Sequence, residues 1–128
     1  MRTIYKYPLE TVDTQIIEVP GIFGFGNSFN KQFLCIDVQY GVPCLWCIVD
    51  TDSKSKRKIK LRIVGTGNPM PEFLGNEDYL GSYQLLDGQF VGHVFVEEII
   101  EEYVVNKCTK LQMLQIEKAM SNKNLLTK

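Results

Sequence analysis

The side chains that could do chemistry in this sequence begin with a pair of cysteines. Cys44 and Cys47 have the CxxC spacing of metal and redox sites. They lie in an apolar run, residues 44–49, which predicts a strand. Residues three apart on a strand point to opposite faces, and no second CxxC or histidine pair is present to complete a zinc site. We therefore expect no metal and no cofactor, and interpret the cysteines as buried hydrophobes of a reducing compartment.

His93 is the only histidine, and it lies in an apolar stretch. A histidine in such a stretch is more often a core or cross-strand residue than a catalyst, and no nucleophile or ligand partner is evident in the sequence. The carboxylates are scattered along the chain. These observations predict a protein that is not an enzyme.

A short basic segment is a candidate for binding an anion. Residues 58–64 alternate basic and aliphatic side chains, which predicts a strand with its aliphatic side chains inward. Residues 65–69 follow as a glycine-rich turn, whose backbone amides can form an anion-binding nest. The alternatives are a solvated face that blocks edge-to-edge aggregation and a purely structural turn. The candidate residues are Lys58, Lys60, Arg62, Thr66 and Asn68.

Nucleic acid is not an expected ligand of this basic segment. The positions between its basic residues are aliphatic, whereas readers of nucleic acid more often place exposed aromatic rings there. The net charge of the chain is −1, so the whole molecule does not attract a polyanion.

A second candidate segment, residues 21–30, alternates glycines with phenylalanines. One interpretation is a loop whose aromatic rings fold back over the core. The other is a flexible apolar flap that binds a ligand or a partner. The rings in question are Phe23, Phe25 and Phe29.

The sequence changes character at Glu97. Residues 97–126 contain strong helix formers and neither glycine nor proline, which predicts one helix or two. We expect residues 97–128 to be a helical extension of a β-domain that spans residues 1–96. The extension could pack on an open sheet face, or it could bind a partner or a second copy of the chain. The residues expected to make that contact are Ile100, Tyr103, Val104, Leu111 and Leu114.

The elements that must position these residues are mostly strands. Residues 33–49 predict a hairpin with a tight turn at Tyr40-Gly41-Val42. Alternation in its first strand places Leu34, Ile36 and Val38 on one face and polar side chains on the wet face. Its second strand is uninterrupted and apolar, and Trp46, the only tryptophan, is expected to anchor the core.

Five further strands are expected around this hairpin, at residues 3–7, 14–19, 58–64, 79–86 and 89–96. The last two are expected to form a second hairpin across a two-residue turn at Asp87-Gly88. The predicted fold is mainly β (α+β overall). It is a sandwich or partly open barrel of six or seven mostly antiparallel strands, followed by a C-terminal helix or two.

Length and composition bound the class of protein. The 128 residues suffice for one domain with one core, and the 45% hydrophobic and 23% charged residues are typical of a soluble globular protein. No apolar run approaches the ~20 residues of a membrane helix, and the first residues lack the apolar region of a signal peptide. We expect a cytoplasmic protein without a membrane partner.

Five segments, taken in order, resemble a family of small uncharacterised proteins of bacteriophages and prophages. They are residues 4–10 (IYKYPLE), 16–20 (IIEVP), 38–50 (VQYGVPCLWCIVD), 65–69 (GTGNP) and 79–95 (YLGSYQLLDGQFVGHVF). The family pattern usually has histidine where this chain has Asn68. The family has no established activity, so the resemblance supplies no catalytic residue.

The resemblance implies an accessory protein of a phage that acts in the cytoplasm of the host cell. We therefore expect a non-enzymatic protein that binds a host protein, with a component of a host defence system as one class of target. The alternative is a protein that binds or sequesters a small anionic ligand, such as a nucleotide signal.

Overall fold

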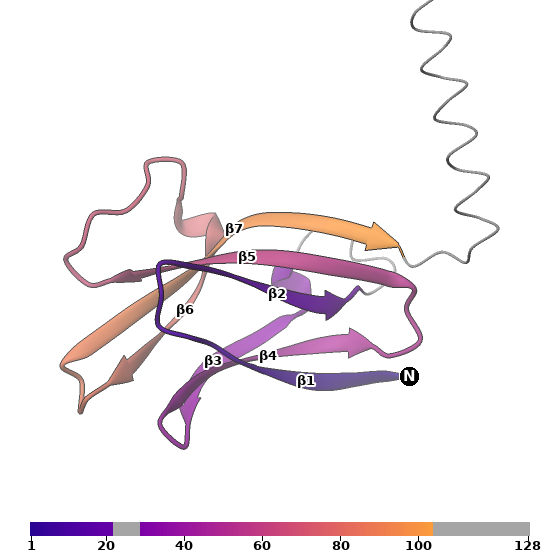
Figure 1. Ribbon diagram of the computed structural model, residues 1–128, viewed down its shortest axis with the longest axis horizontal. Helices are drawn as coiled ribbons and strands as arrows, with labels where there is room; N and C mark the ends of the chain where they lie inside the picture. The colour runs from indigo at the N-terminus through magenta and orange to yellow at the C-terminus, as the bar shows by residue number, and fades with distance from the viewer. Residues whose placement is uncertain (22–28, 104–128) are drawn as a thin grey trace, which may run out of the picture.

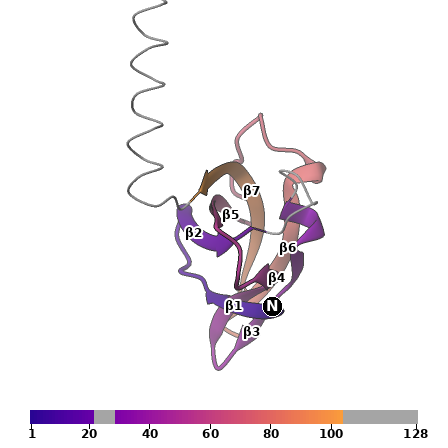
Figure 2. The same cartoon turned by 90° about the vertical axis from the view of Figure 1, so that its right-hand side faces the viewer.

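Alternating side chains build seven strands, which form two antiparallel sheets, so the mainly β prediction is confirmed. The computed structural model describes residues 1–21 and 29–103. The three-stranded sheet has the order β1 (Arg2–Pro8), β4 (Val42–Asp50), β3 (Phe33–Gln39). The four-stranded sheet has the order β2 (Thr14–Pro20), β5 (Ser55–Gly65), β7 (Phe90–Tyr103), β6 (Tyr79–Leu85). Strands β1, β3 and β4 lie below β2, β5 and β7 in both views, and the sheets do not close into a barrel (Figures 1 and 2).

The core lies between the two sheets and is filled by the inward side chains of the central strands. On β5, Ile59 and Leu61 are completely buried and Ile63 nearly so, as the alternation predicts. On β4, the buried set is Leu45, Cys47 and Val49. Tyr83 of β6 lies against Gly92 of β7, where any side chain would collide with its ring. The backbone of β7 can therefore approach this ring only because residue 92 is glycine.

Trp46 is half-buried, so the prediction that it anchors the core is wrong. It alternates with Leu45 and Cys47, whose side chains point inward, and therefore points to the outer face of the three-stranded sheet. Arg57 is the opposite case. It shares the inward parity of Ile59 and is 1% exposed, with Nη1 donating to Oε1 of Gln32 at 3.5 Å.

The two hairpins have different connections. Tyr40 and Gly41 form the predicted tight turn of the β3–β4 hairpin, both with positive φ (52° and 78°). The β6–β7 hairpin has four loop residues, 86–89, instead of the predicted two, because Leu85 pairs with Phe90. Leu86, Asp87 and Gly88 are all left-handed. The tips of the two hairpins lie side by side at the same end of the molecule (Figure 1).

Bulges interrupt the alternation in three strands. Leu34 is the extra residue of β3, between Phe33, which pairs with Cys47, and Cys35, which pairs with Trp46. Leu34 is consequently 44% exposed rather than turned to the core as expected, although Ile36 and Val38 do pack against the core. Glu97 is the extra residue of β7 and Leu80 that of β6. A bulge redirects the side chains on its strand, and here it decides which ones face outward.

The predicted helix does not begin at Glu97, because β7 continues to Tyr103. The strand is favoured by its neighbour, since the register places Glu98, Glu101 and Glu102 opposite basic residues of β5. Residues 104–128 lie outside the described residues, so the rest of the predicted helix stays a prediction. The helical elements of the described residues are two single turns, η1 (Phe29–Lys31) and η2 (Asn76–Asp78), and neither has the length to cross a membrane.

Candidate functional site

The predicted aromatic flap is represented in the described residues by Phe29 alone. Phe29 is 1% exposed and belongs to the core, with its ring centroid 6.3 Å from that of Phe33. It therefore follows the interpretation in which the loop's rings fold back over the core. Phe23 and Phe25 lie outside the described residues.

The predicted anion-binding face of β5 carries its own counter-charge. Glu97 of β7 accepts hydrogen bonds from Nε and Nη2 of Arg62 at 2.9 and 2.6 Å. The other oxygen of Glu97 lies 2.8 Å from Nζ of Lys60. The Glu97 side chain is only 7% exposed, and the bulge at this position is what turns it toward the two basic residues.

The electrostatics of this cluster favour the charged form of Glu97. The hydrogen bond from Lys60, followed by the contacts with Arg62, lowers the pKa of the Glu97 carboxyl below its ordinary value. An anion binding to Lys60 and Arg62 would have to displace this carboxylate. Lys58 lies on the same strand, half-buried, and Lys56 next along pairs with Glu18 at 3.5 Å. The basic charge on the outer face of the four-stranded sheet is thus largely balanced by carboxylates of the same sheet.

The predicted turn residues Thr66 and Asn68 have structural partners. Thr66 Oγ1 lies 2.7 Å from Nε2 of His93, and the hydroxyl of Tyr79 lies 3.0 Å from the other ring nitrogen. His93 thus has partners that the sequence did not reveal. Neither hydroxyl carries the charge that would stabilise an imidazolium in catalysis, and the contacts tie the turn to β6 and β7.

Asn68 closes the same turn. Its backbone N–H donates to the carbonyl of Gly65 at 3.0 Å, and its amide group lies where a side chain on Gly65 would have to be. A hollow of about 160 Å³ beside it is lined by Asn68, Arg62 and Asp13 among others. The structure therefore brings Arg62 and Asn68 together, but with an acidic side chain in the same wall, which disfavours an anion.

The residues predicted for the C-terminal contact are only partly described. Ile100 lies on β7, pairs with Lys58 and is 42% exposed. Tyr103 ends β7 opposite Ser55. Val104, Leu111 and Leu114 lie outside the described residues.

The cysteines of the CxxC pair lie on β4 and are both buried. They are three residues apart on a strand and so point to opposite faces, as expected. Burial raises the pKa of the Cys47 thiol to about 12. Cys35 is a free thiol on the surface.

The outer face of the three-stranded sheet is a surface that sequence reasoning missed. Trp46 and Ile48 of the central strand are half-buried there, Ile4 of β1 is 57% exposed and Leu34 of β3 is 44% exposed. The register places Ile4 beside Ile48 and Cys35 beside Trp46, so these side chains adjoin across all three strands. We call Ile4, Leu34, Trp46 and Ile48 the tryptophan face.

Two shallow hollows indent the tryptophan face. One, of about 290 Å³, is lined by Ile4, Leu34, Cys35, Asp37 and Trp46. The other, of about 330 Å³, is lined by Arg2, Thr3, Ile4 and Ile48. Ile4 lines both, so the hollows adjoin. The signal that could have found this face is the uninterrupted apolar run 44–49, because a strand that is apolar at every position has two apolar sides.

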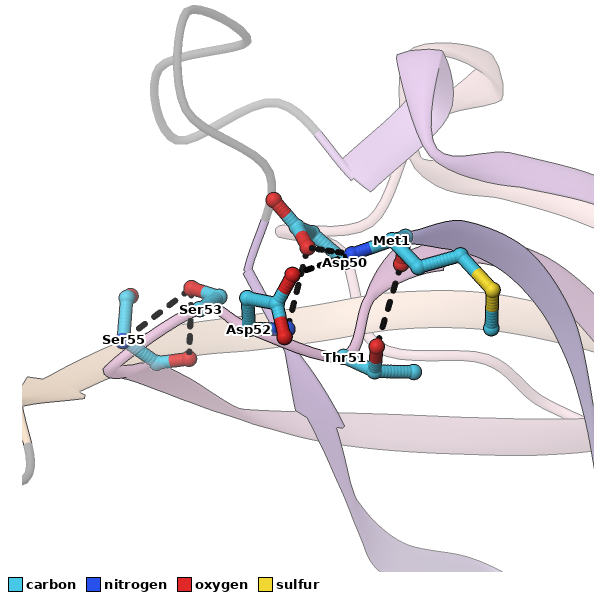
Figure 3. A network of polar contacts seen from close by, with 6 residues as sticks. All are labelled: Met1, Asp50, Thr51, Asp52, Ser53 and Ser55. Carbon is cyan, nitrogen blue, oxygen red and sulfur yellow. Dashed lines mark hydrogen bonds and ion pairs between the residues drawn. The ribbon is translucent and has the colours of Figure 1, made fainter.

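A polar network fixes the end of this sheet (Figure 3). The amino group of Met1 pairs with the carboxylates of Asp50 and Asp52, and the carbonyl of Met1 accepts a hydrogen bond from the Thr51 N–H at 2.9 Å. The hydrogen bond to Asp52, and then that to Asp50, raises the pKa of the amino group above its ordinary value. The N–H of Asp52, and then the amino group, lowers the pKa of the Asp50 carboxyl. The network holds β1 against the loop after β4, and thereby holds Ile4 in place.

Comparison with known proteins gives a family and no activity. The model of a family described as a domain of unknown function, DUF7352, matches residues 1–103, and the chain belongs to that family. The match ends at the residue where β7 ends. A search of the curated proteins and a search of the solved structures found no match.

Proposed function

We propose that this protein is a non-enzymatic accessory protein of a bacteriophage that binds a host protein through the tryptophan face. The observation that carries the proposal is the half-buried position of the only tryptophan, flanked by exposed Ile4 and Leu34, on a sheet face with no further layer over it among the described residues. Contiguous apolar surface of this kind is typical of protein interaction sites, and tryptophan is enriched among the residues that dominate binding energy.

The chemistry of the face fits a protein partner better than a small polar ligand. Its hollows are shallow and mainly apolar, whereas small-molecule sites are usually concave and enclose most of the ligand. A flat apolar centre with a charged rim, here Arg2 and Asp37, is the usual anatomy of a protein interface. The phage origin, the host cytoplasm and a defence protein as the partner rest on the resemblance of the five sequence segments described above.

The alternative function, binding of a nucleotide signal, draws less support from the geometry. Its two best residues, Lys60 and Arg62, already share Glu97. The hollow nearest to them, of about 160 Å³, is too small for a nucleotide, since ligand sites are roughly 300–1,000 Å³.

The test compares two isoleucines that differ only in their sheet. Ile4 on β1 is 57% exposed and Ile16 on β2 is 60% exposed, and both lie on edge strands. Full-length wild type, Ile4→Thr and Ile16→Thr are used to capture proteins from a bacterial lysate, followed by mass spectrometry. We expect a partner that wild type and Ile16→Thr retain and that Ile4→Thr loses.

A cross-link then locates the contact. Cys35 adjoins Trp46 and is exposed, so a photoreactive maleimide on Cys35 of a Cys108→Ser chain should cross-link the captured partner. A partner that Ile4→Thr retains in full, or that the Cys35 probe never reaches, would contradict the proposal. A cross-link to a second copy of the chain would instead identify the face as a dimer interface.

A further inference from the structure

The tips of the two hairpins flank an open cleft that is separate from the tryptophan face. Its volume is about 670 Å³, within the range of ligand sites. Val38 of β3 and Leu85 of β6 line it, and both are half-buried and pack against the core. Gly41 borders it from the first hairpin, and residues 86–88 border it from the second. The cleft therefore has an apolar floor between two turns that are far apart in sequence.

Both turns hold a large apolar side chain in a backbone conformation that such residues avoid. Tyr40 has φ 52° and is 95% exposed, and Leu86 has φ 54° and is 73% exposed. Asparagine or glycine would adopt the left-handed conformation at lower cost, and neither exposed side chain contributes to the core. Strained residues of this kind cluster at sites of function, and here the two turns flank one cleft, which Leu86 and Gly41, the neighbour of Tyr40, both line.

Asp87 carries the one charge among the described residues that line the cleft, and it has no counter-charge there. Asp87 and Gln84 line it, and their side chains make no hydrogen bond or ion pair with any described residue. No basic residue lines the cleft within residues 1–21 and 29–103. An apolar floor with a carboxylate at the rim is complementary to a long aliphatic side chain with a cationic head.

We infer that the cleft between the hairpin tips binds an exposed arginine side chain of a partner protein. The aliphatic stem of the arginine lies on Val38 and Leu85, and its guanidinium meets the Asp87 carboxylate, which a planar fork of donors matches in two hydrogen bonds. Tyr40 precedes Gly41 of the lining, and in the complex its exposed ring turns to the same cation. The cleft and the tryptophan face are distinct surfaces, so this inference does not depend on the function proposed above.

The test uses the full-length protein and two blocked peptides, acetyl-Leu-Arg-amide and its neutral isostere acetyl-Leu-citrulline-amide. Each is titrated into ¹⁵N-labelled protein, and the amide shifts are followed by NMR. We expect saturable shifts of Gly41 and of residues 86–88 with the arginine peptide, and about threefold to fivefold weaker binding of the citrulline peptide, as expected for a partly exposed ion pair.

Two variants give the matched control. Asp87→Asn removes the charge and keeps a residue that tolerates the left-handed conformation, so the fold is retained and the two peptides should bind equally. Glu72→Gln removes one charge from an exposed position elsewhere and should leave the difference between the peptides unchanged. Equal binding of both peptides to wild type, an undiminished difference in Asp87→Asn, or shifts confined to another surface would overturn the inference.

A third variant tests the role of the strained rim. Tyr40→Asn should raise the melting temperature, because asparagine tolerates the left-handed conformation, and should weaken the arginine peptide at the same time. A rise in melting temperature with unchanged affinity for the arginine peptide would show that Tyr40 is not part of the site. The comparison of the arginine and citrulline peptides would still test whether the cleft binds an arginine side chain.

Discussion

The outer faces of the two sheets differ in where their side chains find partners. On the four-stranded sheet, Lys60 and Arg62 share the carboxylate of Glu97. The positive charge of these two side chains is therefore already paired within the protein. On the three-stranded sheet, Trp46, Ile4 and Leu34 remain partly in water with no layer over them among the described residues. A face whose charges are already paired within the protein contributes little binding free energy to a complex. An apolar face contributes binding free energy with every contact that removes it from water. The basic segment of β5, although more conspicuous in the sequence, is therefore a weaker candidate for a binding surface than the tryptophan face.

The largest expected effect separates the two sides of strand β4. Leu45→Ala should lower the free energy of unfolding by about 3 kcal/mol, because Leu45 is completely buried and its truncation leaves a cavity. Trp46→Ala should cost less than half as much, because the larger residue lies on the outer face. Urea denaturation of both variants measures the difference. Equal losses would mean that Trp46 belongs to the core after all.

The next effect tests the internal neutralisation of the four-stranded sheet. Glu97→Gln should lower the free energy of unfolding by about 1–2 kcal/mol, because two basic side chains lose their shared counter-charge while they remain partly exposed. Glu72→Gln, at an exposed position outside the sheets, is the control and should change it by less than about 0.5 kcal/mol. Similar losses of unfolding free energy in both variants would show that the bulge gives the Glu97 carboxylate no special contribution to stability.

The loss of stability in Glu97→Gln should depend on pH in a defined direction. The pKa of Glu97 is lowered in the folded protein, so its stabilisation is present above the pKa of the unfolded state, about 4.3, and is lost as the pH falls through the folded value. The stability difference between wild type and Glu97→Gln should accordingly be constant near neutrality and shrink below pH ~4. A difference that grows on acidification would reverse the assigned sign.

Salt should affect the two faces differently. Raising NaCl from about 50 to about 500 mM should reduce the stability difference between wild type and Glu97→Gln by a few tenths of a kcal/mol, since Lys60 and Arg62 are partly exposed and salt screens their charge. The difference between wild type and Trp46→Ala should not fall, because burial of apolar surface is not screened. Chemical denaturation with urea at the two salt concentrations measures both differences. A parallel fall in both would erase the distinction between the faces.

The smallest effect concerns the network at Met1. The pKa of the amino group is raised in the folded protein, so its contribution is complete below the pKa of the unfolded state and is lost as the pH rises through the folded value, above pH ~8. Asp52→Asn should lower the pKa of the amino group, which NMR of the ¹³C-methylated amine reports. An unchanged pKa in the variant would show that Asp52 is not the main partner.

The fold was largely predictable because alternation is strong in β5 and in most of the other strands. The errors in the strands have two physical causes. Bulges insert one residue and reverse the parity, which turned Leu34 outward and brought Glu97 against Lys60 and Arg62. An uninterrupted apolar run has no parity at all, so the face of Trp46 could not be read from residues 44–49 until Leu45 and Cys47 were seen to be buried.

The misassigned start of the helix at Glu97 and the candidate sites depend on contacts between distant segments. The glutamates of residues 97–102 satisfy a helical pattern locally, but the opposite charges of β5 are across from them in the register. His93 meets Thr66 and Tyr79 only through the fold. The cleft between the hairpin tips needs two turns 46 residues apart, Tyr40 and Leu86, and no local pattern joins them.

Because Cys47 is buried, the rate at which its thiol is alkylated can report the rate at which the protein opens. Its thiol is inaccessible and, with its pKa raised to about 12, almost entirely protonated, so an alkylating reagent can modify it only while the strands are apart. Cys35 on the surface reacts at once and serves as the zero point. In a background with Cys44→Ala and Cys108→Ser, the slow phase of alkylation would time the opening of the sandwich in native buffer, without denaturant.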